Sequence, residues 1–171
     1  MKNINILTLG CSKNTYDSEL LIGGLKKNKF GVAFDDAETV YQAASSLENL
    51  EIIGIDCHIG SQITSLSPYQ ESINTLMNLV ESLAAGGITL RHIDIGGGLG
   101  INYEDEEPPS PTELVESICS SINDKTYELI IEPGRSIVGN AGILLTKVLF
   151  LKNNLEKNFA IVDAAMNDLI R

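Results

Sequence analysis

The sequence predicts an α/β fold: about half of a (β/α)8 barrel of the TIM type, running into the start of a β domain. Three observations support this prediction. Short apolar segments alternate with amphipathic helical segments in the middle of the chain, as parallel strands with helical crossovers do. Glycine and polar residues directly follow three of the apolar segments. The length of 171 residues falls short of the about 250 residues of a complete barrel.

The composition excludes several classes of protein. Hydrophobic residues make up 43% of the chain and charged residues 20%, which is typical of a chain that buries a core. A net charge of −11 argues against a nucleic-acid partner. The sequence shows neither a long apolar run nor a signal peptide, so we expect no membrane partner and a cytoplasmic location. Cys11, Cys57 and Cys119 form no CxxC pair, so we expect neither a disulfide framework nor a metal site.

The first predicted elements are a strand over residues 4–9 and a helix capped by Thr15. A second helix can be capped by Asp35 or Asp36. Its apolar stripe has helical spacing and consists of Ala37, Val40, Tyr41, Ala44 and Leu47. The nearly continuous apolar run over residues 52–57 predicts a parallel strand that is covered on both faces.

Two further helices have the same pattern at their start. Ser67 and Ser110 each precede a proline, and Gln70 and Glu113 stand three residues after them, which predicts a capping box in both cases. The apolar stripe of the first of these helices consists of Tyr69, Ile73, Leu76, Val80 and Leu83.

Apolar segments at 89–95 and 127–131 predict the next strands. After about residue 140, the segments 142–151 and 159–162 have no helical pattern between them. We therefore expect antiparallel or poorly anchored strands from this point to the end of the chain.

Polar and glycine-rich residues lie just past the carboxyl ends of three predicted strands. His58 and Ser61 follow the first, Gly96–Gly98 follow the second, and Glu132 and Arg135 follow the third. In barrels and open α/β sheets this rim carries the active site. We therefore expect these residues to form one pocket.

Each of these groups has a structural as well as a functional interpretation. The triple glycine can be a flexible turn, His58 a hydrogen-bonded strand end, and Glu132 with Arg135 a surface ion pair. In the functional interpretation, the glycine amides approach a phosphate and Arg135 holds it with its fork of donors. Glu132 then keeps a pyridine nitrogen protonated, as in pyridoxal phosphate chemistry.

Five ordered motifs resemble the diaminopimelate decarboxylases, which are alanine-racemase-like, fold-type III pyridoxal phosphate enzymes. The motifs are KFGV at 29–32, GIDCHIGSQ at 54–62, DIGGGLG at 94–100, IEPGRSIV at 131–138 and VDAAMNDLIR at 162–171. The resemblance covers about residues 29–171. It implies a lyase of lysine biosynthesis that uses pyridoxal 5'-phosphate to convert meso-diaminopimelate to L-lysine and CO2. A homodimer is a further expectation.

The resemblance also implies roles by motif position. The residues expected to bind the cofactor are His58, Ser61, Gly96, Gly97, Gly98, Glu132, Pro133, Gly134 and Arg135. Among them, His58 would stack on the cofactor ring and Glu132 would face the pyridine nitrogen. Arg135 and Arg171 would contact the substrate.

The sequence departs from the family in one respect that matters for catalysis. The family's Schiff-base lysine stands in a Tyr-x-x-Lys-Ala-Asn type of motif, which is absent here. We therefore assign no catalytic residue, expect no covalent attachment of pyridoxal phosphate, and predict that the chain is inactive alone. The alternative is a non-catalytic folded fragment or chimera that at most binds the cofactor or phosphate weakly.

Residues 1–28 resemble another family, the radical-SAM methylthiotransferases, through INILTLGCSKN at 4–14 and DSE at 17–19. Cys11 would be the first of three cluster ligands, but Cys57 and Cys119 do not match the other two, so we expect no iron–sulfur site. The sequence thus predicts a chimera of two unrelated gene pieces that join near residues 26–29, whether by natural fusion, assembly artefact or deliberate recombination, and it divides into three segments. They are a methylthiotransferase-like β-α segment at 1–28, a partial cofactor-binding barrel at 29–140, and the start of a C-terminal β domain at 141–171.

Overall fold

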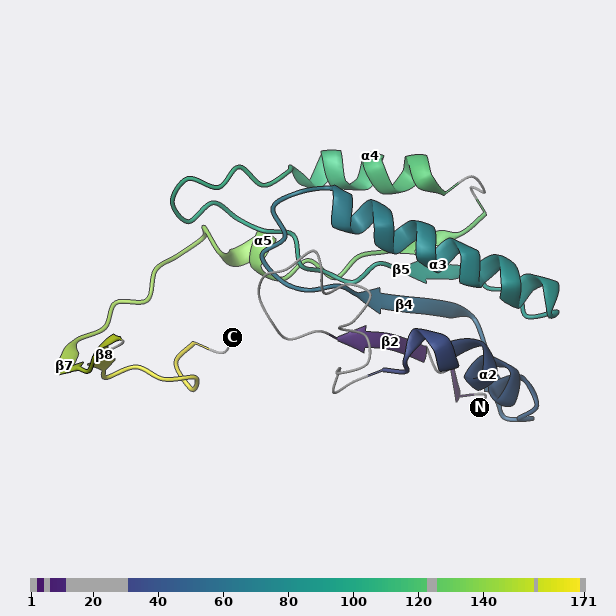
Figure 1. Ribbon diagram of the computed structural model, residues 1–171, viewed down its shortest axis with the longest axis horizontal. Helices are drawn as coiled ribbons and strands as arrows, with labels where there is room; N and C mark the ends of the chain where they lie inside the picture. The colour runs from purple at the N-terminus through teal and green to yellow at the C-terminus, as the bar shows by residue number, and fades with distance from the viewer. Residues whose placement is uncertain (1–2, 5–6, 12–30, 123–125, 156, 170–171) are drawn as a thin grey trace. The chain divides into compact units, whose positions relative to one another are not determined.

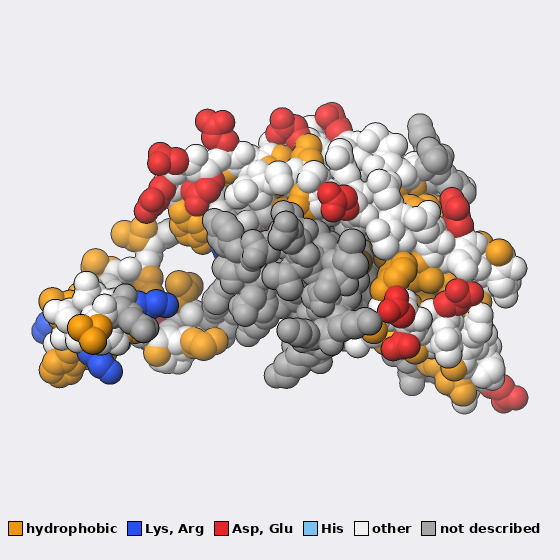
Figure 2. Space-filling model, in the orientation of Figure 1, with side chains coloured by type: hydrophobic (Ala, Val, Ile, Leu, Met, Phe, Trp, Pro, Cys, Tyr) orange, Lys and Arg blue, Asp and Glu red, His pale blue; other side chains and the backbone are white. Residues whose placement is uncertain are grey.

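The computed structural model describes residues 3–4, 7–11, 31–122, 126–155 and 157–169. Met1–Gly139 and Asn140–Arg171 form two compact units, called the first and the second unit below. Figure 2 shows Asp and Glu side chains over much of the visible face of the first unit, in line with the excess of acidic residues. No helix among the described residues is long and apolar enough to cross a lipid bilayer.

A four-stranded parallel sheet forms the centre of the first unit (Figure 1). Its strands, in spatial order, are β2 (Leu7–Cys11), β4 (Gly54–His58), β5 (His92–Asp94) and β6 (Glu128–Ile130). Strands β1 (Asn3–Ile4) and β3 (Leu50–Glu51) form a separate parallel pair. Strands β4, β5 and β6 follow one another in both sequence and space, and one helix lies between each strand and the next. They are therefore successive barrel units. The predicted partial barrel is confirmed.

Helices α2 (Phe34–Ser45), α3 (Ser67–Ala85) and α4 (Pro111–Ser121) pack against this sheet. Ile55 of β4 and Ile93 of β5 are register partners, are fully buried, and belong to the same core cluster as the apolar sides of the helices. The apolar stripe predicted for α3 is confirmed, since all five of its residues are buried. Since successive strand residues point to opposite faces, the neighbours of Ile55 and Ile93, Asp56 and Asp94, face away from this core.

The start of α4 is as predicted, with Ser110 at the N-cap. The Glu113 amide donates to Ser110 Oγ at 3.2 Å, and the Ser110 amide donates to a Glu113 carboxylate oxygen at 2.7 Å. The Ser110 amide, together with the Ser110 hydroxyl, which donates to the same carboxylate oxygen at 2.8 Å, lowers the pKa of the Glu113 carboxyl below its ordinary value, because both bonds stabilise the ionised form. Both halves of the capping box are therefore formed.

The caps predicted for α2 and α3 are wrong. Leu66, without a side-chain bond, is the N-cap of α3, and Gln70 instead donates to Ser117 Oγ of α4 at 2.9 Å. Ala33 is the N-cap of α2, and Asp35 and Asp36 lie in its first turn, where carboxylates suit the helix dipole.

The remaining helical expectations concern the apolar stripe of α2 and the helix at Thr15. Of the stripe predicted for α2, Tyr41 is fully buried, but Leu47 lies beyond the helix end and is 54% exposed. The helix expected to begin at Thr15 lies outside the described residues. A four-residue helix that the sequence did not predict, α5 (Arg135–Val138), follows β6.

The second unit contains an antiparallel pair, as predicted for this part of the chain. Strand β7 (Val148–Asn153) pairs with β8 (Asn158–Val162). Asp163 follows β8, and its carboxylate accepts hydrogen bonds from Thr146 Oγ1 at 2.7 Å and from the Lys147 amide at 2.8 Å. These two bonds lower the pKa of Asp163 and close the open end of the pair.

Candidate functional site

The chain segments that follow β4, β5 and β6 meet at the carboxyl end of the sheet. His58 is the last residue of β4, and its Nδ1 accepts a hydrogen bond from the Gly97 amide at 3.2 Å. The Glu132 amide, two residues past β6, donates to the Gly96 carbonyl at 2.8 Å. The glycine turn after β5 therefore connects His58 on one side with Glu132 on the other.

Backbone shape and close contact both require glycine in this turn. Gly96 has φ 69° and Gly98 has φ 96°, which L side chains rarely adopt. A Cβ on Gly96 would lie 2.9 Å from His58 Nδ1, and one on Gly97 would overlap the Glu132 carbonyl oxygen. The turn is thus a tight junction of three strand ends rather than a flexible connection.

The amides of the turn differ in what they bind. The Gly96 amide donates to Asp94 Oδ1 at 2.8 Å, and the Gly97 amide donates to His58. Within the described residues, the Gly98 amide donates to no group. Of the three amides that the sequence proposes for phosphate binding, Gly98 is therefore the one best placed to receive an anion without breaking an internal bond.

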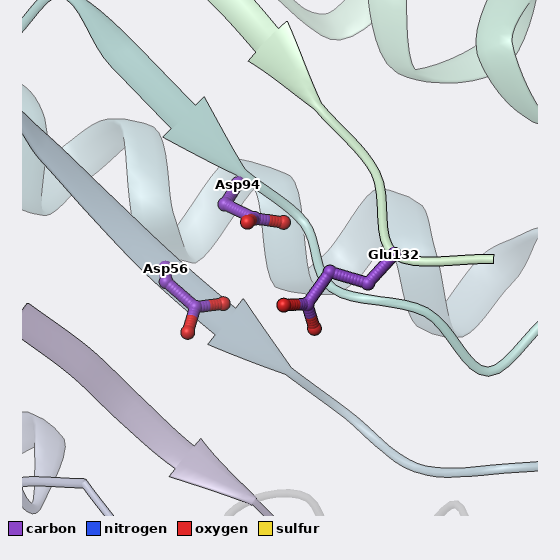
Figure 3. Close-up of side chains that lie close together, drawn as sticks. All are labelled: Asp56, Asp94 and Glu132. Carbon is purple, nitrogen blue, oxygen red and sulfur yellow. The ribbon is translucent and has the colours of Figure 1, made fainter. Parts of the chain in front are cut away.

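Three carboxylates converge beside this turn (Figure 3). Asp56, Asp94 and Glu132 come from three neighbouring strands or strand ends, and one oxygen of each lies within 4.8 Å of the others. Asp56 and Asp94 are register partners and are only 6% and 8% exposed, whereas Glu132 is exposed. Because like charges at this separation repel each other, a positively charged group among them, either a protonated ring nitrogen or a metal ion, is favoured.

The sequence analysis missed Asp56 and Asp94 because it assigned them to apolar strands. The signal that could have found them is their shared position. Each carboxylate stands two residues before a predicted site residue, Asp56 before His58 and Asp94 before Gly96. Charged residues rarely lie inside a doubly covered strand unless they are paired or functional.

The Arg135 side chain lies against the segment after β4. Its Nη2 donates to Ser61 Oγ at 3.0 Å and its Nη1 to Gln62 Oε1 at 3.1 Å. The guanidinium carbon lies 5.7 Å from the centre of the Tyr103 ring, within the range of a cation–π contact. The structure thus places Arg135 and Ser61 together, as the predicted site requires, and adds Gln62 and Tyr103, which the sequence analysis did not single out.

Gln62 joins the loops around Arg135. Its Nε2 donates to the Ile101 carbonyl at 2.6 Å, and its Oε1 accepts from the Ile101 amide at 3.1 Å. Its φ of 58° lies in the left-handed region, the only such non-glycine value among the described residues. A strained backbone held by several side-chain bonds is typical of functional sites.

A largely apolar groove borders the glycine turn. It is lined by Gly96, Gly97, Leu99, Pro111, Leu114, Ile131, Pro133, Ser136 and Ile137. Pro133, a predicted site residue, thus lies at the groove. Gly134 is the N-cap of α5, and a Cβ placed on it would meet no atom within 4 Å.

The remaining predicted residues lie elsewhere or outside the described residues. Arg171 is outside them. The lysines of the first unit also lie outside the described residues; they are Lys2, Lys13, Lys26, Lys27, Lys29 and Lys125. Cys57 is partly buried and packs against the core cluster. Burial raises the pKa of its thiol, and its sulfur lies 3.3 Å from Ser72 Oγ. His92, at the start of β5, lies away from the carboxyl rim, with Nδ1 2.9 Å from Glu128 Oε2.

Comparison with known sequences gives a family for this arrangement. Residues 6–139 match the profile of the pyridoxal-dependent decarboxylase, pyridoxal binding domain. Diaminopimelate decarboxylase of Pseudomonas aeruginosa is 55% identical over 148 residues, which are 86% of this chain and 36% of that protein. The same enzyme of Aquifex aeolicus is 52% identical over 149 residues, with the same two shares. The chain therefore spans about a third of the length of the curated relatives it matches.

Solved structures give the same result for the fold. A diaminopimelate decarboxylase from Helicobacter pylori, complexed with L-lysine, matches with a TM-score of 0.69 at 41% identity, over 85% of this chain and 36% of that one. The enzyme from M. jannaschii matches with a TM-score of 0.74 at 35% identity, over 96% of this chain and 40% of that one.

The family profile begins at residue 6, inside the segment 1–28 for which the sequence predicts a separate origin, and that origin stays a prediction. The profile covers most of the chain, and the rim residues described above lie within it. This chain belongs to the pyridoxal-dependent decarboxylases, and residues 6–139 correspond to their pyridoxal-binding domain.

Proposed function

We propose that this chain carries the cofactor-binding part of a diaminopimelate decarboxylase, the enzyme that releases CO2 from meso-diaminopimelate to give L-lysine. The observation that carries the proposal is the meeting of Glu132, Asp56 and Asp94 beside the glycine turn, at the same rim as Arg135 and Ser61. The relatives named diaminopimelate decarboxylase support the choice of substrate.

The described residues fit pyridoxal phosphate at both of its charged ends. The carboxylate cluster favours a protonated ring nitrogen, and Glu132 is its exposed and hence accessible member. Arg135 and Ser61 supply donors for a phosphate, and the Gly98 amide adds a backbone donor. The rim therefore has an acidic part and a donor part, as a ligand with a cationic nitrogen and an anionic phosphate needs.

Pyridoxal phosphate, when bound, supplies an electron-poor ring that takes up the electron pair left behind by a departing carboxylate. The task of the chain is to hold and tune this ring. Glu132 keeps a proton at the ring nitrogen, and His58, fixed by the Gly97 amide, covers a ring face. Arg135 binds the phosphate, or the carboxylate of the substrate, with two donors in one plane.

The chain alone is proposed to bind the cofactor weakly and without a covalent bond. Covalent anchoring needs a lysine amine at the rim, and the sequence lacks the lysine motif that supplies this amine in the family. The missing motif also favours the second candidate function, a non-catalytic fragment that binds pyridoxal phosphate or phosphate. The substrate site, Arg171 included, and a homodimeric assembly belong to the same proposal.

Equilibrium binding to the full chain tests the proposal. We expect calorimetry to show pyridoxal phosphate binding that inorganic phosphate competes away, and weaker binding of pyridoxal, which lacks the phosphate. The ligand should leave on dialysis, and borohydride should attach it to no single lysine. No binding of pyridoxal phosphate at any accessible concentration would contradict the proposed function.

A CO2-release assay separates the two candidates. With pyridoxal phosphate and meso-diaminopimelate added, we expect no turnover by the chain alone. Turnover comparable to that of a complete decarboxylase would show that the chain is a working enzyme and that the inactive-fragment alternative is wrong. Light scattering of the same sample tests the homodimer, and a monomer would contradict that part.

A further inference from the structure

Tyr69 connects the hydrophobic core to the candidate site. It lies in the first turn of α3, is 2% exposed, and packs in the core cluster with the apolar residues of that helix. Its hydroxyl donates to the Gly97 carbonyl at 3.1 Å. A buried tyrosine hydroxyl without a partner would destabilise the fold, so the Gly97 carbonyl has a fixed place relative to α3.

Gly97 carries this constraint to His58. Its amide donates to His58 Nδ1 at 3.2 Å, while its carbonyl accepts from Tyr69. The Glu132 carbonyl lies so close to the Gly97 Cα that no Cβ would fit between them. The two bonds and this contact leave the Gly97 backbone little freedom to turn its amide away from His58.

The bond to Nδ1 determines where His58 carries its proton. A nitrogen that accepts a hydrogen bond from an amide holds no proton, so the neutral imidazole is protonated at Nε2. A neutral imidazole also suits a neighbouring ring with a protonated nitrogen, because an imidazolium there would repel it. The glycine turn therefore selects the form of His58 that is compatible with the proposed ligand.

We infer that Tyr69 is a positioning residue, whose hydroxyl, through Gly97, holds His58 in the Nε2-protonated form. The inference rests on the proposed function only for the use that a ligand makes of His58. The hydrogen bonds from Tyr69 to Gly97 and from Gly97 to His58 are present without a ligand, so both bonds can be tested in the ligand-free chain.

The chain contains a matched control for this role. Tyr41 of α2 is fully buried, and its hydroxyl also donates to a backbone carbonyl, that of Gly54, at 3.0 Å. Gly54 is the first residue of β4 and His58 the last, so this bond lies at the opposite end of the strand. Tyr41→Phe thus removes the same kind of bond from the same core without touching the turn.

Nitrogen NMR of the imidazoles in the full, ligand-free chain tests the inference. The chain has 2 histidines, and a His92→Gln variant assigns the signals of His58. At a pH of about 8.5, where a free imidazole is neutral, we expect a proton on Nε2 and none on Nδ1 in the wild type. Tyr69→Phe should produce a measurable population with the proton on Nδ1, and Tyr41→Phe should leave the wild-type pattern.

Binding provides the second readout. Tyr69→Phe should weaken pyridoxal phosphate binding about fivefold, the size of one neutral hydrogen bond, and Tyr41→Phe should leave it unchanged. An Nδ1-bound proton on His58 in the wild type overturns the inference without any variant, and so does a Tyr69→Phe spectrum equal to that of Tyr41→Phe. Absence of cofactor binding in the wild type overturns only the proposed function, since the proton position is read without ligand.

Discussion

The guanidinium of Arg135 donates a hydrogen bond to the hydroxyl of Ser61 at 3.0 Å, although the two residues stand 74 positions apart in the chain. Arg135 begins α5, after β6, and Ser61 follows β4, which is separated from β6 by β5 in the sheet. The bond therefore joins segments that follow two strands on either side of β5, and it brings two polar side chains together at the carboxyl rim.

Replacing Arg135 should weaken anion binding selectively. We expect Arg135→Ala to lower the affinity for inorganic phosphate and pyridoxal phosphate by about 10- to 100-fold, the contribution of a charged hydrogen-bond donor. Arg135→Lys should restore only part of it, because an ammonium group is a point charge without the planar fork. Calorimetry with both ligands measures the two effects.

Arg91→Ala is the control for charge alone. Arg91 is exposed, pairs with Glu51 at 3.1 Å, and stands just before β5, at the amino end of the strands. Its loss removes one positive charge from the same unit but none from the rim. If both arginine variants lose phosphate affinity equally, the rim assignment is wrong.

Glu132 should act on a ring nitrogen and not on the phosphate. We therefore expect Glu132→Gln to change phosphate affinity by less than about twofold, because an exposed charge beyond contact distance is screened by salt. Affinity for pyridoxal phosphate should fall more than affinity for phosphate. Glu128→Gln, at the start of β6 and beside His92, is the control and should change neither. Equal losses of phosphate affinity in Glu132→Gln and Arg135→Ala would contradict the separate roles proposed for the two residues.

The close contact at Gly97 predicts a stability effect. Gly97→Ala places a methyl group on the Glu132 carbonyl, so the turn or the segment after β6 must move. We expect a loss of about 1–3 kcal/mol in the free energy of unfolding, the usual effect of overpacking. Urea unfolding measures it, with Gly134→Ala as the control, since a Cβ there meets nothing within 4 Å. Equal stabilities of the two variants would contradict the close packing of the turn.

Gln62 has a strained backbone and several side-chain hydrogen bonds. Two variants separate the effect of the strain on stability from the effect of the lost bonds. Gln62→Ala and Gln62→Gly both lose the amide that holds Ile101 and Arg135. Only glycine adopts φ 58° without strain, so the glycine variant should be more stable than the alanine variant by about 1 kcal/mol. Urea unfolding of the pair decides this, and a more stable alanine variant would contradict the left-handed conformation at this position.

The sequence predicted the parallel α/β order because the apolar periods of strands and helices are local patterns. Helix starts were predicted less well, since tertiary contacts compete with local caps. Ser110 and Ser67 stand in similar motifs, but only Ser110 forms a capping box. At α3 the helix begins one residue earlier, and Gln70 bonds to Ser117 of α4 instead of reaching back.

The sequence also predicted that His58, Gly96 and Glu132 lie at one rim of the sheet, where the structure brings them together, because strand ends mark this rim. It did not reveal which groups support that site, since these contacts join residues far apart in the chain. The helical stripe predicted that Tyr69 is buried, but its bond to Gly97 depends on how α3 packs over the turn. Asp56 and Asp94 face each other only through strand register, which no local pattern specifies.

The hydrogen bonds of the Gly96 and Gly97 amides have a consequence for the kinetics and entropy of binding. Both amides are engaged by Asp94 and His58 before any ligand arrives, so the turn has its final shape in the free chain. Ordering a backbone residue takes about 1–2 kcal/mol of conformational entropy, which a ligand here does not have to supply. A ligand should therefore bind in a single step limited by diffusion, without a slow loop closure. A weakly bound ligand should dissociate quickly.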